Sequence, residues 1–425
     1  MREKSFFTIK AVRALFFFVT ALICTTAGYW GTEFARFPTA FKLMEGQANG
    51  TYSQLPVQAV FEAENEAVLR LNNRPLSENA AINLNRRNII KPQESGSATM
   101  TLKAFGLPLK KVTLDILPDL EVIPCGMAVG VRVDTMGVMV LGTGIVEVGN
   151  GQTVNPSAEI LQSGDLILRA NEEDVKTKEQ FEQIVRESEA AISLEIKRED
   201  EIITAWVTPV ENQIGAWVRD GTQGIGTITY YNPHTNRFAA LGHGIVDVDT
   251  KQMMRIKSGE IKESEIDSVV KGKRGTPGEL IGELRRGGII GRVEQNSVYG
   301  VFGTVDIHAR NKLPREKMPI ALQDAVRPGP AIIRANVERD VVTEFDIYIE
   351  AVNRTAGSDD TRGMVIRITD PALLARTNGI VQGMSGSPII QNGRLIGAVT
   401  HVFVHDPSKG YGIFIENMLK YELSL

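Results

Sequence analysis

The stretch Gly-Met-Ser-Gly-Ser-Pro, residues 383–388, determines how the rest of the chain is interpreted. A serine between glycines and before a proline is presented at a tight turn, because glycine accepts backbone dihedrals that a side chain forbids. The missing side chains also let a substrate carbonyl approach backbone N–H groups, which stabilise the oxyanion of acyl transfer. The segment therefore predicts that Ser385 is a nucleophile, with an ordinary Gly/Ser loop as the alternative.

A serine nucleophile needs a base, and the chain has only five histidines. His243 stands between glycines in Ala-Leu-Gly-His-Gly-Ile, residues 240–245, after an apolar stretch and before an alternating run. This pattern predicts a strand end or loop edge, where a histidine can face a cleft. A histidine that only caps a turn is the alternative. A histidine that precedes the serine by a long stretch of chain follows the order required in a two-barrel peptidase.

Two longer motifs give the chain a specific resemblance. One is Leu-Gly-His-Gly-Ile-Val-Asp-Val-Asp-Thr, residues 241–250, and the other comprises parts of the run from Ile368 to Tyr411. With these motifs the chain resembles the SpoIVB (stage IV sporulation protein B) peptidase family. Members of that family carry a membrane segment, a PDZ-like region and a peptidase region in the same order.

The resemblance implies a chymotrypsin-like domain of two β-barrels over residues 215–425, with His243 and Ser385 facing each other across a cleft. Short apolar runs punctuated by glycine recur in this region, which independently suggests a barrel or a sandwich. Asn392-Gly393 between apolar pairs predicts a β-hairpin. The backbone N–H groups of Gly383 and Ser385 are expected to form the oxyanion hole.

The third catalytic residue is an acid that holds the imidazole in the correct tautomer. Asp370, in Ile-Thr-Asp-Pro, matches the acidic position of the family, in the segment that leads to the serine. In two-barrel peptidases the acid usually comes from the first barrel, so Asp247, Asp249 and Asp306 stay candidates. An aspartate before a proline also forms turns, which is the structural alternative for Asp370.

Composition limits the class of protein. Forty glycines and 6% aromatic residues in 425 residues favour turn-rich β structure, and the length predicts two or three domains. The net charge of −4 does not suggest nucleic-acid binding. His401 and His405 are close in the chain but enclose an apolar run, so we expect neither a metal site nor a cofactor. Cys24 and Cys125 are expected to be free thiols.

Residues 1–34 are interpreted as a targeting segment. Four basic residues precede an uncharged apolar stretch at residues 14–32, which is just long enough to span a bilayer. An uncleaved membrane anchor is favoured over a cleaved signal peptide, and the remainder would then be exported. Residues 35–121 alternate in part and predict a small β-rich region or a linker.

Residues 122–211 are interpreted as a PDZ-like α+β domain. Thr177 to Gln180 form a capping box that predicts a helix start, and alternating apolar residues predict a closing strand after it. The loop and first strand that would receive a peptide are predicted at five consecutive residues: Gly126, Met127, Ala128, Val129 and Gly130. Such a groove binds a peptide as an added strand. Packing against the peptidase without ligand is the alternative.

Two functions remain. The first is an exported serine endopeptidase. By resemblance it cleaves itself near its N-terminus and cleaves a membrane-bound regulator between the forespore and mother-cell membranes, which leads to sigma factor activation. The second is a membrane-anchored, non-catalytic PDZ scaffold. The expected partners are a protein substrate and the chain's own N-terminal segment, with the membrane contacted through residues 14–32.

Overall fold

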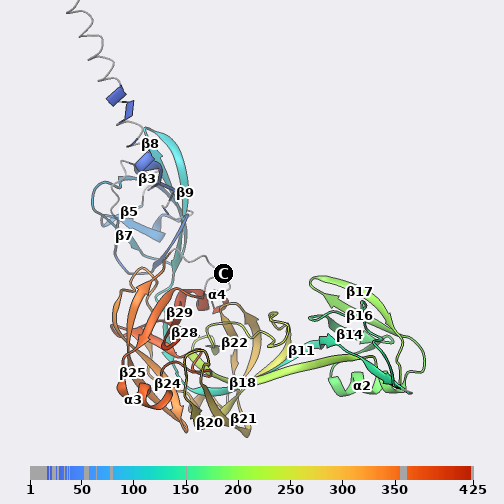
Figure 1. The fold of residues 1–425 in the computed structure, drawn as a ribbon. Coiled ribbons are helices and arrows are strands. Elements are labelled where there is room, and N and C mark those ends of the chain that lie inside the picture. The colour runs from blue at the N-terminus through green and yellow to red at the C-terminus, as the bar shows by residue number, and fades with distance from the viewer. Residues whose placement is uncertain are drawn as a thin grey trace, which may run out of the picture. The chain divides into compact units, whose positions relative to one another are not determined.

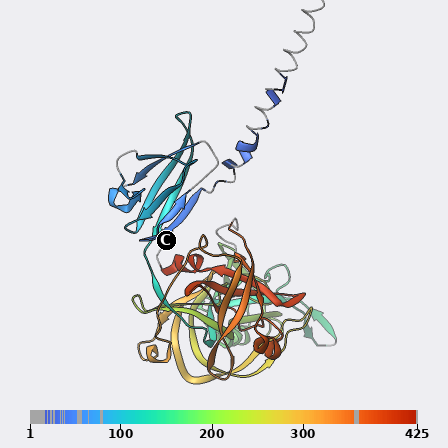
Figure 2. The same ribbon diagram turned by 90° about the vertical axis from the view of Figure 1, so that its left-hand side faces the viewer.

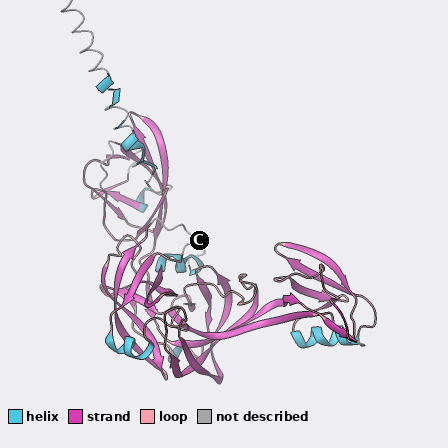
Figure 3. Ribbon diagram, in the orientation of Figure 1, coloured by secondary structure: helices cyan, strands magenta, loops and turns pink. Residues whose placement is uncertain are grey.

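The computed structural model describes residues 39–51, 57–63, 65–76, 80–149, 151–354 and 361–422, with a few positions between 17 and 37. The chain forms two compact units, Met1–Leu120 and Glu121–Leu425, and each is treated by itself below (Figure 1). Strands predominate in both units, which confirms the prediction of a mainly β protein (Figure 3).

The first unit contains two β-sheets. One has the strand order β1 (Ala40–Met44), β9 (Leu107–Leu117), β8 (Gly96–Ala104), β3 (Gln58–Ala63) and β6 (Ala80–Asn83). The other has the order β2 (Asn49–Thr51), β7 (Asn88–Pro92), β4 (Leu69–Leu71) and β5 (Arg74–Pro75), with the 3-10 turn η1 (Glu66–Val68) before β4. Phe61, Leu69 and Leu102 are fully buried in a core of this unit alone. The described residues of this first unit therefore form a β module with its own core, and not a linker.

The predicted membrane segment, residues 14–32, lies partly outside the described residues, and Cys24 is among the residues not described. In the part of the chain that the structure describes, no helix combines the length and hydropathy needed to cross a bilayer. The anchor stays a prediction.

Six strands of the second unit close into a first barrel. Their order is β11 (Ala128–Thr143), β20 (Ile256–Val270), β21 (Glu279–Ser297), β22 (Gly300–Val305), β19 (Arg237–Ala240) and β18 (Ala216–Asn232), and β18 pairs back with β11. Val129, Val131 and Val133 point inward at every second position, as a strand with one buried face requires, and pack with Phe238 and Ile261. Two short strands, β10 (Glu121–Pro124) and β23 (Met318–Pro319), extend the sheet beyond β18.

A second closed barrel follows (Figure 2). Its order is β24 (Gly329–Glu338), β25 (Val341–Val352), β26 (Met364–Ile368), β29 (Asp406–Phe414), β28 (Arg394–Phe403) and β27 (Pro388–Gln391). The helix α3 (Pro371–Thr377) separates β26 from β27, α4 (Ile415–Glu422) follows β29, and the 3-10 turn η2 (Arg310–Lys312) precedes β23. Asn392 and Gly393 both have positive φ and join β27 to β28, which confirms the predicted hairpin.

An α+β module is inserted into the first barrel between β11 and β18. Its elements are β12 (Val146–Val148), β13 (Gln152–Val154), β14 (Leu166–Ala170), β15 (Glu173–Asp174), α2 (Lys178–Glu187), β16 (Ile192–Arg198) and β17 (Glu201–Val207). Thr177 caps α2 as predicted, because its hydroxyl accepts a hydrogen bond from the Gln180 N–H. Phe181 and Val185 on α2 pack against Ile167 and Ile196 in a core of the module.

The insertion corrects the predicted domain boundaries. Residues 122–211 were expected to form one PDZ-like domain and residues 215–425 the whole peptidase domain. In the structure, the first half of β11 instead belongs to the first barrel, and β10 extends the sheet of that barrel. Ala128 pairs with β18 alone, and residues 129–134 pair with both β18 and β20. The barrel therefore starts before the module and is completed after it, which local patterning in the sequence does not reveal.

The predicted peptide-binding residues also need correction. Gly126, Met127, Ala128, Val129 and Gly130 enter or form the start of β11. Val129 pairs with Gly226 on one side and with Glu263 on the other. A strand that is paired on both sides has no free edge for a peptide. A side chain at Gly130 would place its Cβ 1.8 Å from a methyl group of Leu284, so the Leu284 side chain would have to move.

We expect Ile366→Ala to lower the free energy of unfolding by about 2–5 kcal/mol, because Ile366 is fully buried in the second barrel and its removal leaves a cavity. Val404→Ala, at an exposed turn, should change it by less than about 0.5 kcal/mol. Urea unfolding of the full chain in a Ser385→Ala background measures both. Equal effects of the two substitutions would contradict the assigned core.

Candidate active site

The first barrel holds the turn that carries Ser385. The Thr227 hydroxyl donates to the Gly383 carbonyl at 2.7 Å, and the Thr227 N–H donates to the Ser385 carbonyl at 3.0 Å. The Thr229 hydroxyl donates to the Gly386 carbonyl at 2.8 Å. Gly386 has φ +97°, and a Cβ there would lie 2.1 Å from the Thr227 carbonyl oxygen, so only glycine fits. Sequence analysis did not identify the two threonines, which lie far before the turn in the chain.

The backbone at Gly383 and Ser385 has the donors expected of an oxyanion hole. Gly383 has φ +96°. Among the described residues, neither the Gly383 N–H nor the Ser385 N–H donates to a protein acceptor, while the neighbouring N–H groups of Gln382, Met384 and Gly386 all do. Two unsatisfied donors beside a reactive hydroxyl are suited to bind the oxygen of a tetrahedral intermediate. The oxyanion-hole assignment stays a prediction.

The imidazole of His243 is held by the backbone of the next residue. Nδ1 lies 2.9 Å from the Gly244 carbonyl oxygen, which can only accept, so Nδ1 carries the proton. Nε2 is then the unprotonated nitrogen, which is the tautomer that a general base needs. Burial lowers the pKa of His243 below its ordinary value, and the hydrogen bond to Gly244 partly opposes this effect. The ring is therefore neutral at neutral pH.

His243 and Ser385 line the same cleft, of about 270 Å³, together with Gly383 and residues 222–225 of β18. In this conformation the Ser385 hydroxyl donates to the Thr400 carbonyl oxygen at 2.8 Å. A hydroxyl has one proton, so this proton is directed to Thr400 and not to the imidazole. Transfer to His243 requires the Ser385 side chain to rotate away from Thr400.

His401 packs against the base. Its ring centroid lies 4.9 Å from that of His243, with an angle of 35° between the ring planes. Desolvation, with smaller effects of the His243 ring and the Arg362 guanidinium, lowers the pKa of His401 to about 4. His401 is thus neutral near pH 7 and adds no positive charge that would oppose protonation of His243.

In the structure, each candidate acid bonds to a group other than the imidazole of His243. Asp370 caps α3, and its carboxylate accepts from the N–H groups of Ala372 and Leu373 at 2.8 and 2.9 Å. The buried Asp247 pairs with Arg219 at 2.6 Å, and Asp249 pairs with the same guanidinium at 2.9 Å. Asp306 accepts from the His308 N–H. The atom that orients His243 here is the Gly244 carbonyl oxygen, and the triad role of Asp370 stays a prediction.

Metal-ligating groups do not cluster in the described part of the chain, where no set of three His, Cys, Asp or Glu residues could hold a metal ion. The free thiol predicted at Cys125 is confirmed. Burial raises the pKa of Cys125 to about 12, so this thiol is not a nucleophile at neutral pH.

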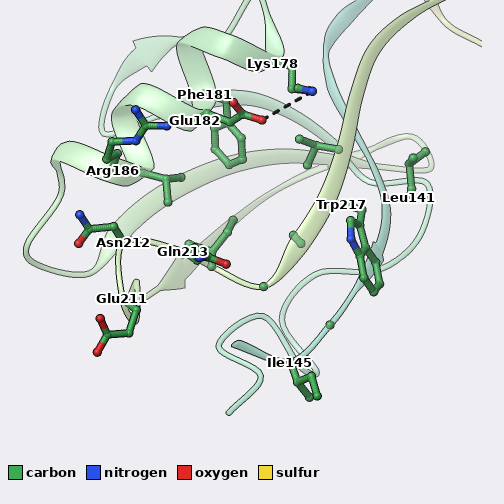
Figure 4. Close-up of a pocket in the computed structure, with 16 residues that line it drawn as sticks. Leu141, Ile145, Lys178, Phe181, Glu182, Arg186, Glu211, Asn212, Gln213 and Trp217 are labelled. Carbon is green, nitrogen blue, oxygen red and sulfur yellow. Dashed lines mark ion pairs between the residues drawn. The ribbon is translucent and has the colours of Figure 1, made fainter. Parts of the chain in front are cut away.

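A hollow of about 710 Å³ lies in the inserted module (Figure 4). Phe181, Glu182 and Val185 of α2 form one wall, and residues 211–218 form the other. Lys178 pairs with Glu182 at 3.7 Å on the helix side. One side of β18 pairs with β11 here, and its other side faces this groove. The groove of the module therefore lies at the start of β18, well after the segment that the sequence suggested.

The groove ends at a tight loop with free donors. Glu211, Asn212 and Gly215 all have positive φ. Within the described residues, the N–H groups of Ile214 and Gly215 donate to no protein acceptor. Arg186 also lines the groove, on the wall formed by α2 (Figure 4). Two consecutive free N–H groups at such a loop favour an anionic group.

Comparison with solved structures finds proteases. The Rv3671c protease from M. tuberculosis, active form, shares 15% identity, with 48% of this chain and 74% of that chain covered and a TM-score of 0.25. The HtrA-type protease AlgW with decapeptide shares 16% identity, with coverages of 48% and 53% and a TM-score of 0.28. Similarity at this level does not establish a shared fold.

Comparison of the sequence with protein-family profiles identifies one family for part of the chain. No curated protein matches the chain. Residues 210–419, which contain His243, Asp370 and Ser385, match the profile of the SpoIVB peptidase S55 family. This region of the chain is therefore a serine peptidase domain of the SpoIVB peptidase S55 family.

Proposed function

We propose that this serine peptidase is an endopeptidase in which Ser385 is the nucleophile and His243 the general base. The observation that carries the proposal is that one cleft holds both side chains together with two free backbone donors. The clamp from Thr227 and Thr229 places the turn of Ser385 against the strand that lines this cleft.

The reaction starts when the Ser385 hydroxyl leaves the Thr400 carbonyl. Nε2 of His243 then takes the hydroxyl proton while Oγ attacks the carbonyl carbon of the substrate. The oxyanion accepts hydrogen bonds from the N–H groups of Gly383 and Ser385. Protonated His243 gives its proton to the leaving amine. Water then attacks the acyl-enzyme with His243 again as the base, and Ser385 regains its proton from His243 as the acid product leaves.

The biological role that we propose follows the family. The peptidase cleaves its own N-terminal region and a membrane-bound regulator in sporulation signalling, which leads to sigma factor activation. The apolar segment at residues 14–32 supports a membrane anchor with the bulk of the chain exported, into the space between the forespore and mother-cell membranes. The inserted module is PDZ-like in this proposal, and the groove beside α2 binds the partner peptide.

Ser385→Ala should reduce cleavage of the chain itself and of a protein substrate by about 10⁴-fold or more, because the nucleophile is removed. The unfolding transition should stay in place, since Ser385 is only half-buried and its hydroxyl bonds a single carbonyl. Ser387→Ala is the matched control in the same turn. Mass spectrometry of new N-termini measures cleavage, and an unchanged rate in Ser385→Ala would reject the proposal.

Asp370→Asn separates the two roles of Asp370. Asparagine is also a good helix N-cap, so α3 and the unfolding free energy should be retained. If Asp370 acts as the triad acid, as we expect from the family motif, cleavage falls by about 10⁴-fold. Full activity of Asp370→Asn, combined with a loss of about 1 kcal/mol in stability for Asp370→Ala, would assign Asp370 to the cap alone.

The pH dependence of kcat/KM should follow His243. Only the neutral imidazole accepts a proton, so activity is lost as pH falls through the pKa of His243, and burial places this midpoint below about 6.5. His401→Ala exposes the ring of His243 to water and should move the midpoint upward, whereas His405→Ala should not. A wild-type midpoint at or above 6.5 would contradict the assignment.

A further inference from the structure

We propose that the end of the hairpin between β8 and β9, in the first unit, inserts into an anionic lipid bilayer. The apolar side chains of Phe105, Leu107 and Leu109 would enter the headgroup boundary, and the basic side chains of Lys103 and Lys111 would contact lipid phosphates. These five residues form the hairpin tip. They lie outside the peptidase domain in the chain, so lipid binding here is a function additional to the proposed one.

The turn of the hairpin carries a residue that its backbone does not favour. Ala104 pairs with Leu107, so Phe105 and Gly106 form a two-residue loop. Their φ angles are +51° and +81°, a conformation in which asparagine, aspartate or glycine is preferred and a bulky side chain is rare. The Phe105 side chain is 97% exposed, so no packing within the chain offsets this strain. We infer that the ring contacts something outside the chain.

The end of the hairpin extends past the neighbouring strands. β8 pairs with β3 only as far as Lys103, and β9 pairs with β1 only from Thr113 onward. Leu107 and Leu109, in the part of β9 before Thr113, are 68% and 49% exposed. Within the described residues, no strand lies beside these apolar side chains to cover them. Exposed apolar side chains that gather at one place mark an interaction site.

The charges of the hairpin favour an anionic partner. Residues 95–114 contain three lysines, at positions 103, 110 and 111, and no acidic residue. Lys111 is exposed and Lys103 is half-buried. Basic residues beside an apolar patch are attracted to anionic lipid headgroups, while their aliphatic stems cover apolar surface.

Two arginines lie at the same end of the sheet. Asn83, the last residue of β6, pairs with Gln58 of β3, and Gln58 also pairs with Lys103. The chain then turns, since the Arg86 N–H donates to the Asn83 carbonyl, and both Arg86 and Arg87 are exposed. The positive charge at this end therefore comes from two loops that are far apart in the chain.

The chain that precedes β1 comes from the same end of the sheet. β1 pairs with β9 in parallel, so the residues before Ala40 extend toward the start of β9. The Lys110 ammonium donates to the Phe37 carbonyl and lies 5.8 Å from the centre of the Phe34 ring. The apolar segment at residues 14–32 leads into this part of the chain. A bilayer that holds the predicted anchor is therefore within reach of the hairpin tip.

A bilayer fits this surface better than a protein partner does. Specific protein interfaces bury about 1,200–2,000 Å² around a packed apolar core. The hairpin tip offers only three apolar side chains at a two-residue turn that projects from its sheet. A projecting apolar turn with basic residues on both strands suits insertion to the depth of the headgroups.

The hairpin tip gives the chain a second membrane contact. If self-cleavage occurs before β1, as the proposed function allows, it removes the apolar segment at residues 14–32 and leaves the hairpin. The cleaved chain then keeps a contact with the membrane that holds its substrate. Membrane binding of this kind is weaker than a spanning helix and depends on anionic lipid.

An environment-sensitive fluorophore tests the insertion in the full chain. Ser385→Ala prevents self-cleavage, Cys24→Ser removes one thiol, and the buried Cys125 stays unlabelled. In this background Phe105→Cys carries the fluorophore, and Ser95→Cys, at the other end of β8 and roughly 30 Å away, is the matched control. With vesicles rich in phosphatidylglycerol, emission from position 105 should shift to shorter wavelength and be quenched by nitroxide-labelled lipid. Position 95 should not respond.

Lysine variants test the contribution of charge. Lys103→Gln combined with Lys111→Gln should lower the ratio of inserted to water-exposed label at position 105 by roughly 10- to 30-fold. Lys91→Gln should preserve this ratio, because Lys91 precedes Pro92, whose carbonyl accepts from Gly46 just beyond the far end of β1. The predicted anchor is present in every variant, so differences between variants report the hairpin tip alone.

Three results would overturn the inference. The label at position 105 could stay in water when vesicles are added, or respond equally to vesicles of pure phosphatidylcholine. It could also shift without vesicles as the protein concentration rises, which would show self-association at the hairpin. None of these results bears on the proposed peptidase function, because the measurement uses the Ser385→Ala chain.

Discussion

The hydrogen bonds between β18 and the turn of Ser385 are the constraint on which the rest of the site depends. The turn belongs to the second barrel, yet Thr227 and Thr229 of the first barrel bind three of its carbonyl groups. Among the described residues, the N–H groups of Gly383 and Ser385 have no protein acceptor, and both residues line the cleft. The two barrels therefore build one active site because a buried strand of one satisfies the backbone of the other.

The same strand lines both the candidate active site and the groove of the inserted module. β18 begins in the groove of the inserted module, passes Arg219 and its two aspartate partners, lines the catalytic cleft and ends by holding the nucleophile turn. Asp247 is buried, and its other oxygen accepts from the N–H groups of Asp249 and Thr250, so the segment after His243 is tied to β18. A module inserted at this point of the barrel is connected through one strand to both residues that we propose as catalytic.

Local sequence patterns correctly predicted the elements that depend on side-chain chemistry within a few residues. The capping residue Thr177, the Asn392-Gly393 hairpin and the strand character of most of the chain follow from side-chain chemistry within a few residues. The boundary of the module could not be predicted in this way. β11 contributes to the barrel in its first half and to the module in its second half, and nothing in its alternating apolar pattern marks the change.

The sequence by itself determined the chemistry of this protein: the serine turn at residues 383–388, the histidine motif around His243 and the family to which residues 210–419 belong. Glycine and reactive side chains carry this information locally, because only certain residues fit such turns. Only the tertiary structure decided that the Gly244 carbonyl orients the imidazole, that Thr400 accepts the Ser385 proton and that the groove lies at residues 211–218. These contacts join backbone groups and strand edges, which are the same in every residue type and acquire a partner only when the chain folds.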